Sequence, residues 1–305
     1  MSRLDLLPNL VIPGVPKAGT SSLFWYLSQH PDICPADRKE VNHFRSLRYG
    51  QEPPGPLEDY ARHFGHCGGR TYRMDASPAY VYGGRRVVEA LHEHLPDPRI
   101  VFILREPVGR LWSSHVSLKE RGKLRSSVGF RAYFEESRRL YDSGRDHLPE
   151  HKQSRGLAIG RYIDVLCDWF EVFDDRVNVL FFEHLAGDPR GVVARLCGWL
   201  GLDGSPAEGF DYSLRNKTVQ PRSRAVAKLV RAVNLRVDRG TRLPPRAKAA
   251  LRSAYGVLNA TRRHEELSPR DRAMAEEFYA PANRALHKEL AQRGYGDLPE
   301  WVTSA

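Results

Sequence analysis

The feature that most constrains the fold of this chain is the run Ile100–Leu104, in which five consecutive residues are apolar. A strand that is apolar at every position is buried on both faces, which is typical of a parallel sheet covered by helices. A second apolar run covers Val177–Phe182, and one interrupted by proline and glycine covers Leu10–Val15. A helical pattern follows each run. We therefore predict an α/β, three-layer fold with a central, mostly parallel sheet of about five strands flanked by helices.

Hydrophobic periodicity and capping residues also predict where the helices lie. No internal repeat or low-complexity tract interrupts the chain, and we expect a single domain over residues 1–305. Its core covers about 8–212, and a basic loop with a helical C-terminal cover takes up about 213–305. The expected helices cover residues 21–29, 60–64, 87–95, 110–119, 128–141, 159–173, 189–200, 226–237 and 268–293.

The chain is basic, with a net charge of +10, which predicts an anionic ligand or surface. Nucleic acid, anionic lipid and a phosphorylated nucleotide with an acidic acceptor all fit that sign. Nothing in the sequence resembles a nucleic-acid recognition motif, so a nucleic-acid partner is not expected. The basic amphipathic segment 226–237 packs on the domain, lies beside an acidic substrate or makes peripheral contact with a membrane.

Cysteine usage and hydropathy indicate the cellular compartment of the protein. No signal-peptide pattern opens the chain and no window has 18 apolar residues, so we expect a cytoplasmic protein without a transmembrane segment. The cysteines lack C-x-x-C or metal-ligand spacing, even with His63 and His66 beside one of them, and no metal is expected. We interpret all four as free thiols in a reducing compartment: Cys34, Cys67, Cys167 and Cys197.

The first candidate binding site is the segment 14–22, Gly-Val-Pro-Lys-Ala-Gly-Thr-Ser-Ser, between a predicted strand and a predicted helix. Backbone N–H groups and the helix dipole favour an oxyanion there, and Lys17 adds a positive charge. The alternative is a P-loop nucleotide kinase or NTPase. That motif requires lysine directly after the second glycine, whereas Lys17 precedes Gly19 by two residues. The order of residues therefore disfavours the kinase.

A second candidate phosphate site follows the strand 100–104. Arg105 stands at its carboxyl end, where open α/β sheets bind ligands. Ser113 lies eight residues further, about two turns into the expected helix. A guanidinium binds phosphate through two hydrogen bonds and a hydroxyl adds a third, so the pair suits a phosphate group.

Together the two segments resemble the PAPS-dependent sulfotransferase family (PAPS is 3′-phosphoadenosine-5′-phosphosulfate), closest to its bacterial and heparan-sulfate sulfotransferase-like branch. They match its patterns Lys-x-Gly-Thr-Ser/Thr and Arg-x-Pro-x-x-Arg-x-x-Ser. The resemblance implies a P-loop-like fold, PAPS as sulfuryl donor, release of PAP and no metal. The resemblance implies that the 5′-phosphate is bound by Lys17, Gly19, Thr20, Ser21 and Ser22. It implies that the 3′-phosphate is bound by Arg105 and Ser113. Arg222 lies where the family has a basic loop over the nucleotide, and the resemblance implies that it binds the nucleotide as well.

The segment 39–44, Lys-Glu-Val-Asn-His-Phe, resembles the family's segment that holds the catalytic glutamate. The resemblance implies that Glu40 is the general base and that Lys17 is catalytic as well. His43 stands one position later than the family's histidine, and it shares the base role, replaces Glu40 or belongs to the core. Ala76 replaces a lysine of the carbohydrate enzymes. The acceptor is therefore left open: a hydroxyl or amine on a carbohydrate, a glycolipid or a small natural-product alcohol.

Overall fold

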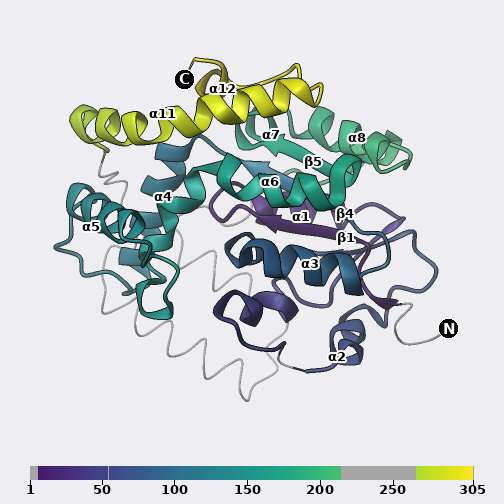
Figure 1. Cartoon of the computed structure of the whole chain (residues 1–305). Helices are drawn as coiled ribbons and strands as arrows, with labels where there is room; N and C mark the ends of the chain where they lie inside the picture. Colours follow the sequence, from purple (N-terminus) through teal and green to yellow (C-terminus); the bar gives the residue numbers. More distant parts are fainter. Residues whose placement is uncertain (1–5, 54, 214–265, 305) are drawn as a thin grey trace, which may run out of the picture.

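The computed structural model describes residues 6–53, 55–213 and 266–304 (Figure 1). Its centre is a five-stranded sheet in which every neighbouring pair of strands is parallel, in the order β2-β3-β1-β4-β5. The predicted α/β class is confirmed, and the sheet is parallel throughout. The strands are β1 (Leu10–Gly14), β2 (Ile33–Pro35), β3 (Tyr72–Asp75), β4 (Arg99–Leu104) and β5 (Val177–Phe181).

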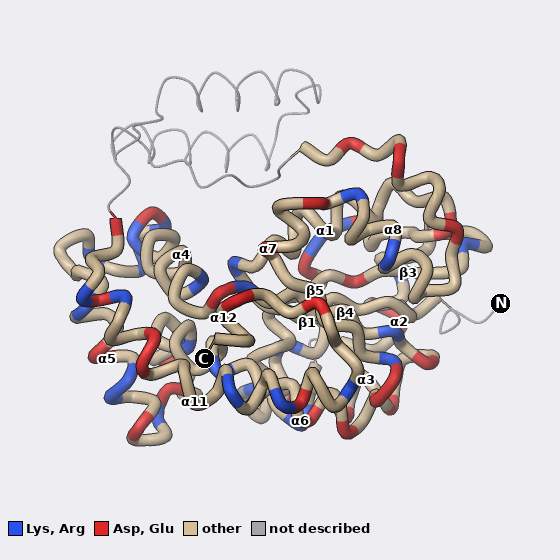
Figure 2. The backbone as a smooth tube through the Cα atoms, turned by 90° about the horizontal axis from the view of Figure 1, so that it is seen from above, with Lys and Arg blue, Asp and Glu red and all other residues tan. Residues whose placement is uncertain are grey.

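Helices cover both faces of the sheet, as Figure 2 shows from above. One face carries α3 (Gly84–His94) and α6 (Tyr162–Phe173), and the other carries α1 (Thr20–Leu27), α7 (Phe182–Gly187) and α8 (Pro189–Trp199). Strand β4 lies between these layers, and residues 100–104 are completely buried. This burial explains why that run is apolar without alternation.

A second, smaller core lies beyond the carboxyl edge of the sheet. There α4 (Pro107–Glu120) and α5 (Phe130–Asp142) pack against α11 (Pro269–Gln292), which α12 (Glu300–Thr303) joins. Glu106 caps α4 by accepting hydrogen bonds from the backbone N–H groups of Val108 and Gly109, so this helix begins directly after the predicted phosphate arginine. The apolar residues of this core include Val108, Leu111, Phe130, Phe134 and Tyr279.

Most predicted elements match the structure to within a few residues, but two strands are missing from the prediction. β2 and β3 lie on either side of residues 36–70, with only three and four residues each. The predicted loop 216–224 and helix 226–237 lie outside the described residues. In the part of the chain that the structure covers, every helix is too short or too polar to serve as a membrane span.

Candidate active site

The predicted phosphate loop connects β1 to α1 at the carboxyl edge of the sheet. Lys17 and Gly19 adopt left-handed backbone conformations, with φ of 73° and 95°. A side chain at Gly19 would place its Cβ only 3.0 Å from the ring of Phe182, so both the conformation and the packing require glycine. The turn brings Lys17 to the N-terminal end of the eight-residue helix α1, where the helix dipole favours an anion.

The hydroxyl residues of this loop form the first turn of α1. Thr20 and Ser22 are buried, each with 6% of its surface exposed, and Ser21 is half-buried. The backbone N–H of Ser22 donates to the carbonyl of Gly19. The structure thus brings all five predicted 5′-phosphate residues into one turn and the start of one helix.

Arg105 connects the second predicted phosphate site directly to the first. Its Nη1 donates to the carbonyl oxygen of Lys17 at 3.1 Å. Its guanidinium lies over the ring of Phe182, 4.6 Å from the centroid, and the Tyr162 hydroxyl donates to its backbone carbonyl at 2.6 Å. β1 and β4 are neighbours in the sheet, so residues 88 positions apart in sequence meet at adjacent strand ends.

The electrostatics of this edge suit an anion. Burial lowers the pKa of Lys17, and the nearby positive charge of Arg121 lowers it further. Burial also lowers the pKa of Arg105. A buried cation gains most from a bound anion, because the anion replaces the solvation that burial removed. Glu120 at the end of α4 opposes the lowering of the lysine pKa, which places that end of α4 near the Lys17 ammonium.

The remaining residues of the predicted phosphate sites lie in different environments or outside the described residues. Ser113 lies on α4, two turns from its start, and is half-buried. Arg110, the second arginine of the motif, is completely buried and donates to the carbonyl of Gly156. Its role is therefore structural. Arg222 lies outside the described residues.

The predicted base segment lies at the other end of the same sheet edge, after β2. The Glu40 side chain is 55% exposed and its carboxylate pairs with Lys39 Nζ at 3.0 Å. Its backbone, in contrast, is held firmly: the N–H of Glu40 donates to the carbonyl of Ala76 at 3.1 Å. The N–H of Asn42 donates to the Ser77 hydroxyl at 2.9 Å. Both residues, Glu40 and Asn42, have positive φ, so these contacts stabilise an uncommon backbone conformation.

A buried carboxylate stabilises the base segment through hydrogen bonds, and the sequence did not predict that role. Asp75 is completely buried at the end of β3. It accepts hydrogen bonds at 2.7 Å from the hydroxyls of Tyr60 and Ser77. Burial raises the pKa of Asp75, whereas those hydrogen bonds lower it. Ser77 thus links Asp75 to the backbone of Asn42, two residues from the candidate base.

His43 lies in the core rather than at the exposed surface of the segment. It is 4% exposed and stacks on Tyr60 at 4.8 Å between ring centroids, with 4° between the ring planes. Its Nε2 is buried without a hydrogen-bond partner. Burial lowers the pKa of His43 to about 4, so the imidazole is neutral near pH 7. Of the two candidate bases, only Glu40 is open to an acceptor.

Comparison with known proteins identifies the family to which this site belongs. A model of the sulfotransferase family matches residues 55–206, about half of the chain. The chain belongs to the sulfotransferase family. Its order of lysine and glycine in the phosphate loop already disfavoured the kinase alternative, and the family match agrees with that order.

Curated relatives of this sulfotransferase include enzymes of heparan sulfate. It is 28% identical over 204 residues to heparan sulfate glucosamine 3-O-sulfotransferase 6 of Mus musculus, which covers 64% of the chain and 52% of the relative. It is 23% identical over 313 residues to the bifunctional heparan sulfate N-deacetylase/N-sulfotransferase of Drosophila melanogaster, covering 98% of the chain and 27% of the relative. The chain thus spans about a quarter to a half of the length of these relatives.

A solved structure supports the fold of the sulfotransferase. The crystal structure of a sulfotransferase from Alicyclobacillus acidocaldarius matches it with a TM-score of 0.66 and 24% identity, over 96% of this chain and 98% of the other. This likeness supports the three-layer, P-loop-like architecture.

The structure corrects the prediction made for the cysteines of the sulfotransferase. The prediction of four free thiols is wrong for two of them, because Cys34 and Cys67 form a disulfide across 33 residues. Strand β2 and the turn after residues 62–64 bring the two together, and no sequence spacing indicated it. Of the cysteines in the part of the chain described here, Cys167 and Cys197 are free.

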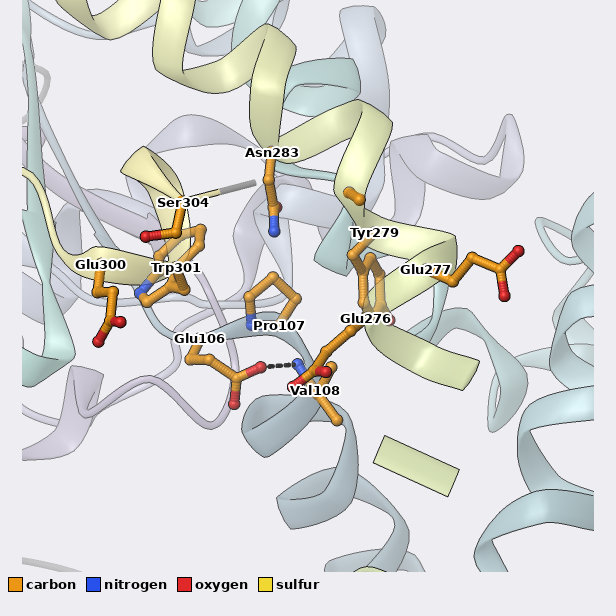
Figure 3. Close-up of a pocket in the computed structure, with 11 residues that line it drawn as sticks. Glu106, Pro107, Val108, Glu276, Glu277, Tyr279, Asn283, Glu300, Trp301 and Ser304 are labelled. Carbon is orange, nitrogen blue, oxygen red and sulfur yellow. Dashed lines mark hydrogen bonds between the residues drawn. The ribbon is translucent and has the colours of Figure 1, made fainter. Parts of the chain in front are cut away.

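A cavity of about 440 Å³ lies between α11, α12 and the start of α4 (Figure 3). Four glutamates line it, Glu106, Glu276, Glu277 and Glu300, together with residues such as Trp301 and Asn283. An acidic lining repels phosphate, and none of the predicted site residues that the structure describes lines this cavity. It is therefore distinct from the candidate nucleotide site, although Glu106 follows Arg105 directly.

Proposed function

We propose that this sulfotransferase transfers a sulfuryl group from PAPS to an acceptor hydroxyl or amine and releases PAP. The observation that carries the proposal is the hydrogen bond from Arg105 to the Lys17 carbonyl. It joins a lysine-bearing turn and a strand-end arginine into one cationic edge. A nucleotide phosphorylated at both its 5′ and its 3′ position has two anionic groups that such an edge would hold apart and orient.

The proposed reaction is an in-line displacement. The acceptor oxygen or nitrogen attacks sulfur and forms the new bond, while the bond from sulfur to the bridging oxygen of PAPS breaks. Lys17 stabilises the negative charge that develops on the departing phosphate oxygen. Glu40 takes the acceptor proton. We assign His43 to the core, because its imidazole is buried and neutral.

The proposal leaves the chemical class of the acceptor open. Ala76 is completely buried beneath the backbone of Glu40, where the carbohydrate enzymes that the chain resembles have a lysine. Heparan-like specificity therefore does not carry over to this position. A carbohydrate, a glycolipid and a small natural-product alcohol all remain acceptors to test, and a cytoplasmic location remains a prediction.

Two measurements test the proposal. Calorimetry should show much tighter binding of PAP than of 5′-AMP, because only PAP has a 3′-phosphate for Arg105. Incubation with labelled PAPS and cell extract should produce labelled products with the mass gain of one SO₃. Equal affinity for PAP and AMP would contradict the donor assignment, and ATP consumption in place of sulfuryl transfer would support the kinase.

A further inference from the structure

Cys34, Cys67 and His66 form a cluster next to the candidate base segment. The ligating atoms of all three lie within 4.8 Å of one another, and His66 Nε2 is 3.4 Å from Cys34 Sγ. Both cysteines are buried, at 0% and 2% exposed, whereas His66 is exposed. His66 and Cys67 are adjacent in the sequence, but Cys34 is 33 residues away from Cys67, which is why the sequence did not reveal the cluster.

Hydrogen bonds also connect the two segments that the disulfide joins. The N–H of Asp37 donates to the carbonyl of His63, and their side chains form a second contact at 2.7 Å. Arg70 Nη1 donates to the carbonyl of Ile33 at 3.3 Å, and the N–H of Cys67 donates to Phe64. Reduction of the disulfide would therefore leave two thiols and an imidazole still facing one another.

We propose that, when the disulfide is reduced, Cys34, Cys67 and His66 bind a zinc ion. A dithiol reductant supplies two electrons and two protons, the S–S bond breaks, and two thiols form. Zinc then binds as both thiols lose their protons, and its charge balances two thiolates that burial would otherwise disfavour. Two thiolates and an imidazole suit zinc. The exposed side at His66 leaves room for water as the fourth ligand.

Two alternative cross-links, a disulfide and a bound metal ion, would then connect the same two segments of the chain. Under oxidising conditions the disulfide connects β2 to residue 67, and under reducing conditions the metal makes the same connection. Residues 36–42, which include the candidate base, begin two residues after Cys34. Either cross-link would hold the start of that segment. This matters for a protein predicted to be cytoplasmic, because disulfides are rare there.

Cobalt(II), followed by zinc, tests the proposal on the full chain. Protein reduced with a phosphine and protein oxidised with diamide are each titrated with cobalt(II), which gives strong visible bands when thiolates bind it tetrahedrally. We expect one equivalent to bind to the reduced protein, none to the oxidised protein, and zinc to displace the cobalt. Loss of a direct ligand in His66→Gln should weaken binding at least as much as loss of a supporting partner does, about 10- to 100-fold.

Matched variants separate the site from adventitious binding. His66 is exposed, so His66→Gln should fold normally, which circular dichroism verifies. Cys167→Ser removes a free, exposed thiol elsewhere and should bind metal like the wild type. The proposal fails if reduced wild type shows no thiolate–cobalt bands, or if His66→Gln binds as tightly as wild type. These readouts do not depend on sulfuryl transfer, so their failure would leave the proposed function intact.

Discussion

The substitution Arg105→Ala tests the arrangement on which the proposed donor site depends. We assign this arginine two separable tasks: it binds the 3′-phosphate of the proposed donor, and its Nη1 holds the Lys17 carbonyl. The guanidinium is charged in both tasks, and a hydrogen bond that involves a charged group contributes about 1.5–3 kcal/mol. The two losses are thus expected to be of similar size, but only the loss of the phosphate contact depends on which nucleotide is bound.

PAP and AMP distinguish the two tasks. AMP lacks the 3′-phosphate, so its affinity should fall only through the loosened Lys17 loop, by at most about 10- to 150-fold. PAP should lose a further 10- to 150-fold, roughly, on top of that. Calorimetry with both nucleotides on wild type and Arg105→Ala measures the difference. Arg62→Ala is the control, because Arg62 is exposed and paired with Asp59 on the surface.

The outcome that would refute the reasoning is an equal loss for the two nucleotides. In that case Arg105 would act only on the Lys17 loop, and the 3′-phosphate would lie elsewhere. A loss of PAP affinity in Arg62→Ala would show instead that net positive charge, not a defined contact, controls binding.

Three further predictions concern the other end of the sheet edge. Glu40→Gln should leave PAP affinity unchanged and lower turnover by about 10²- to 10⁴-fold; a near-wild-type rate would exclude Glu40 as base. The pKa of His43 is lowered from 6.5 to about 4, so the unfolded chain binds more protons between those values. About 3 kcal/mol of unfolding free energy should therefore be lost as pH falls from 6.5 to 4, and less in His43→Gln, by urea denaturation. Under metal-free conditions, reduction should lower that free energy by about 2–4 kcal/mol in wild type and have no effect in Cys34→Ser.

The sequence predicted the central strands and the phosphate residues for one physical reason. β4 is buried on both faces and so is apolar throughout, and the loop after a parallel strand is where ligands bind. Lys17 and Arg105 therefore follow strand ends that could be located from apolar runs in the sequence. Strand β3 contains Arg73 and ends in Asp75, and β2 ends in Pro35. Short strands with such residues leave no apolar run to detect.

The environment of the base segment could not be predicted because distant residues create it. Tyr60 contributes both the stacked ring on His43 and the hydroxyl on Asp75, and nothing in its local sequence indicates either contact. The disulfide likewise depends on β2 lying beside the turn that ends at Cys67. The geometry shows the histidine in the core, where sequence reasoning left its role open.

The proposed donor site and the candidate base are supported by different strands of the sheet, and this separation bears on acceptor specificity. The proposed donor site rests on β1 and β4, the central strands, where Gly19 and Arg105 pack on the same aromatic ring. The candidate base rests on β2 and β3, and the buried Asp75 fixes it through Ser77. Substitutions in residues 36–42 can therefore alter the acceptor side without disturbing the phosphate contacts. Because the two supports share no side chain in these contacts, acceptor specificity is free to diverge while donor binding is retained.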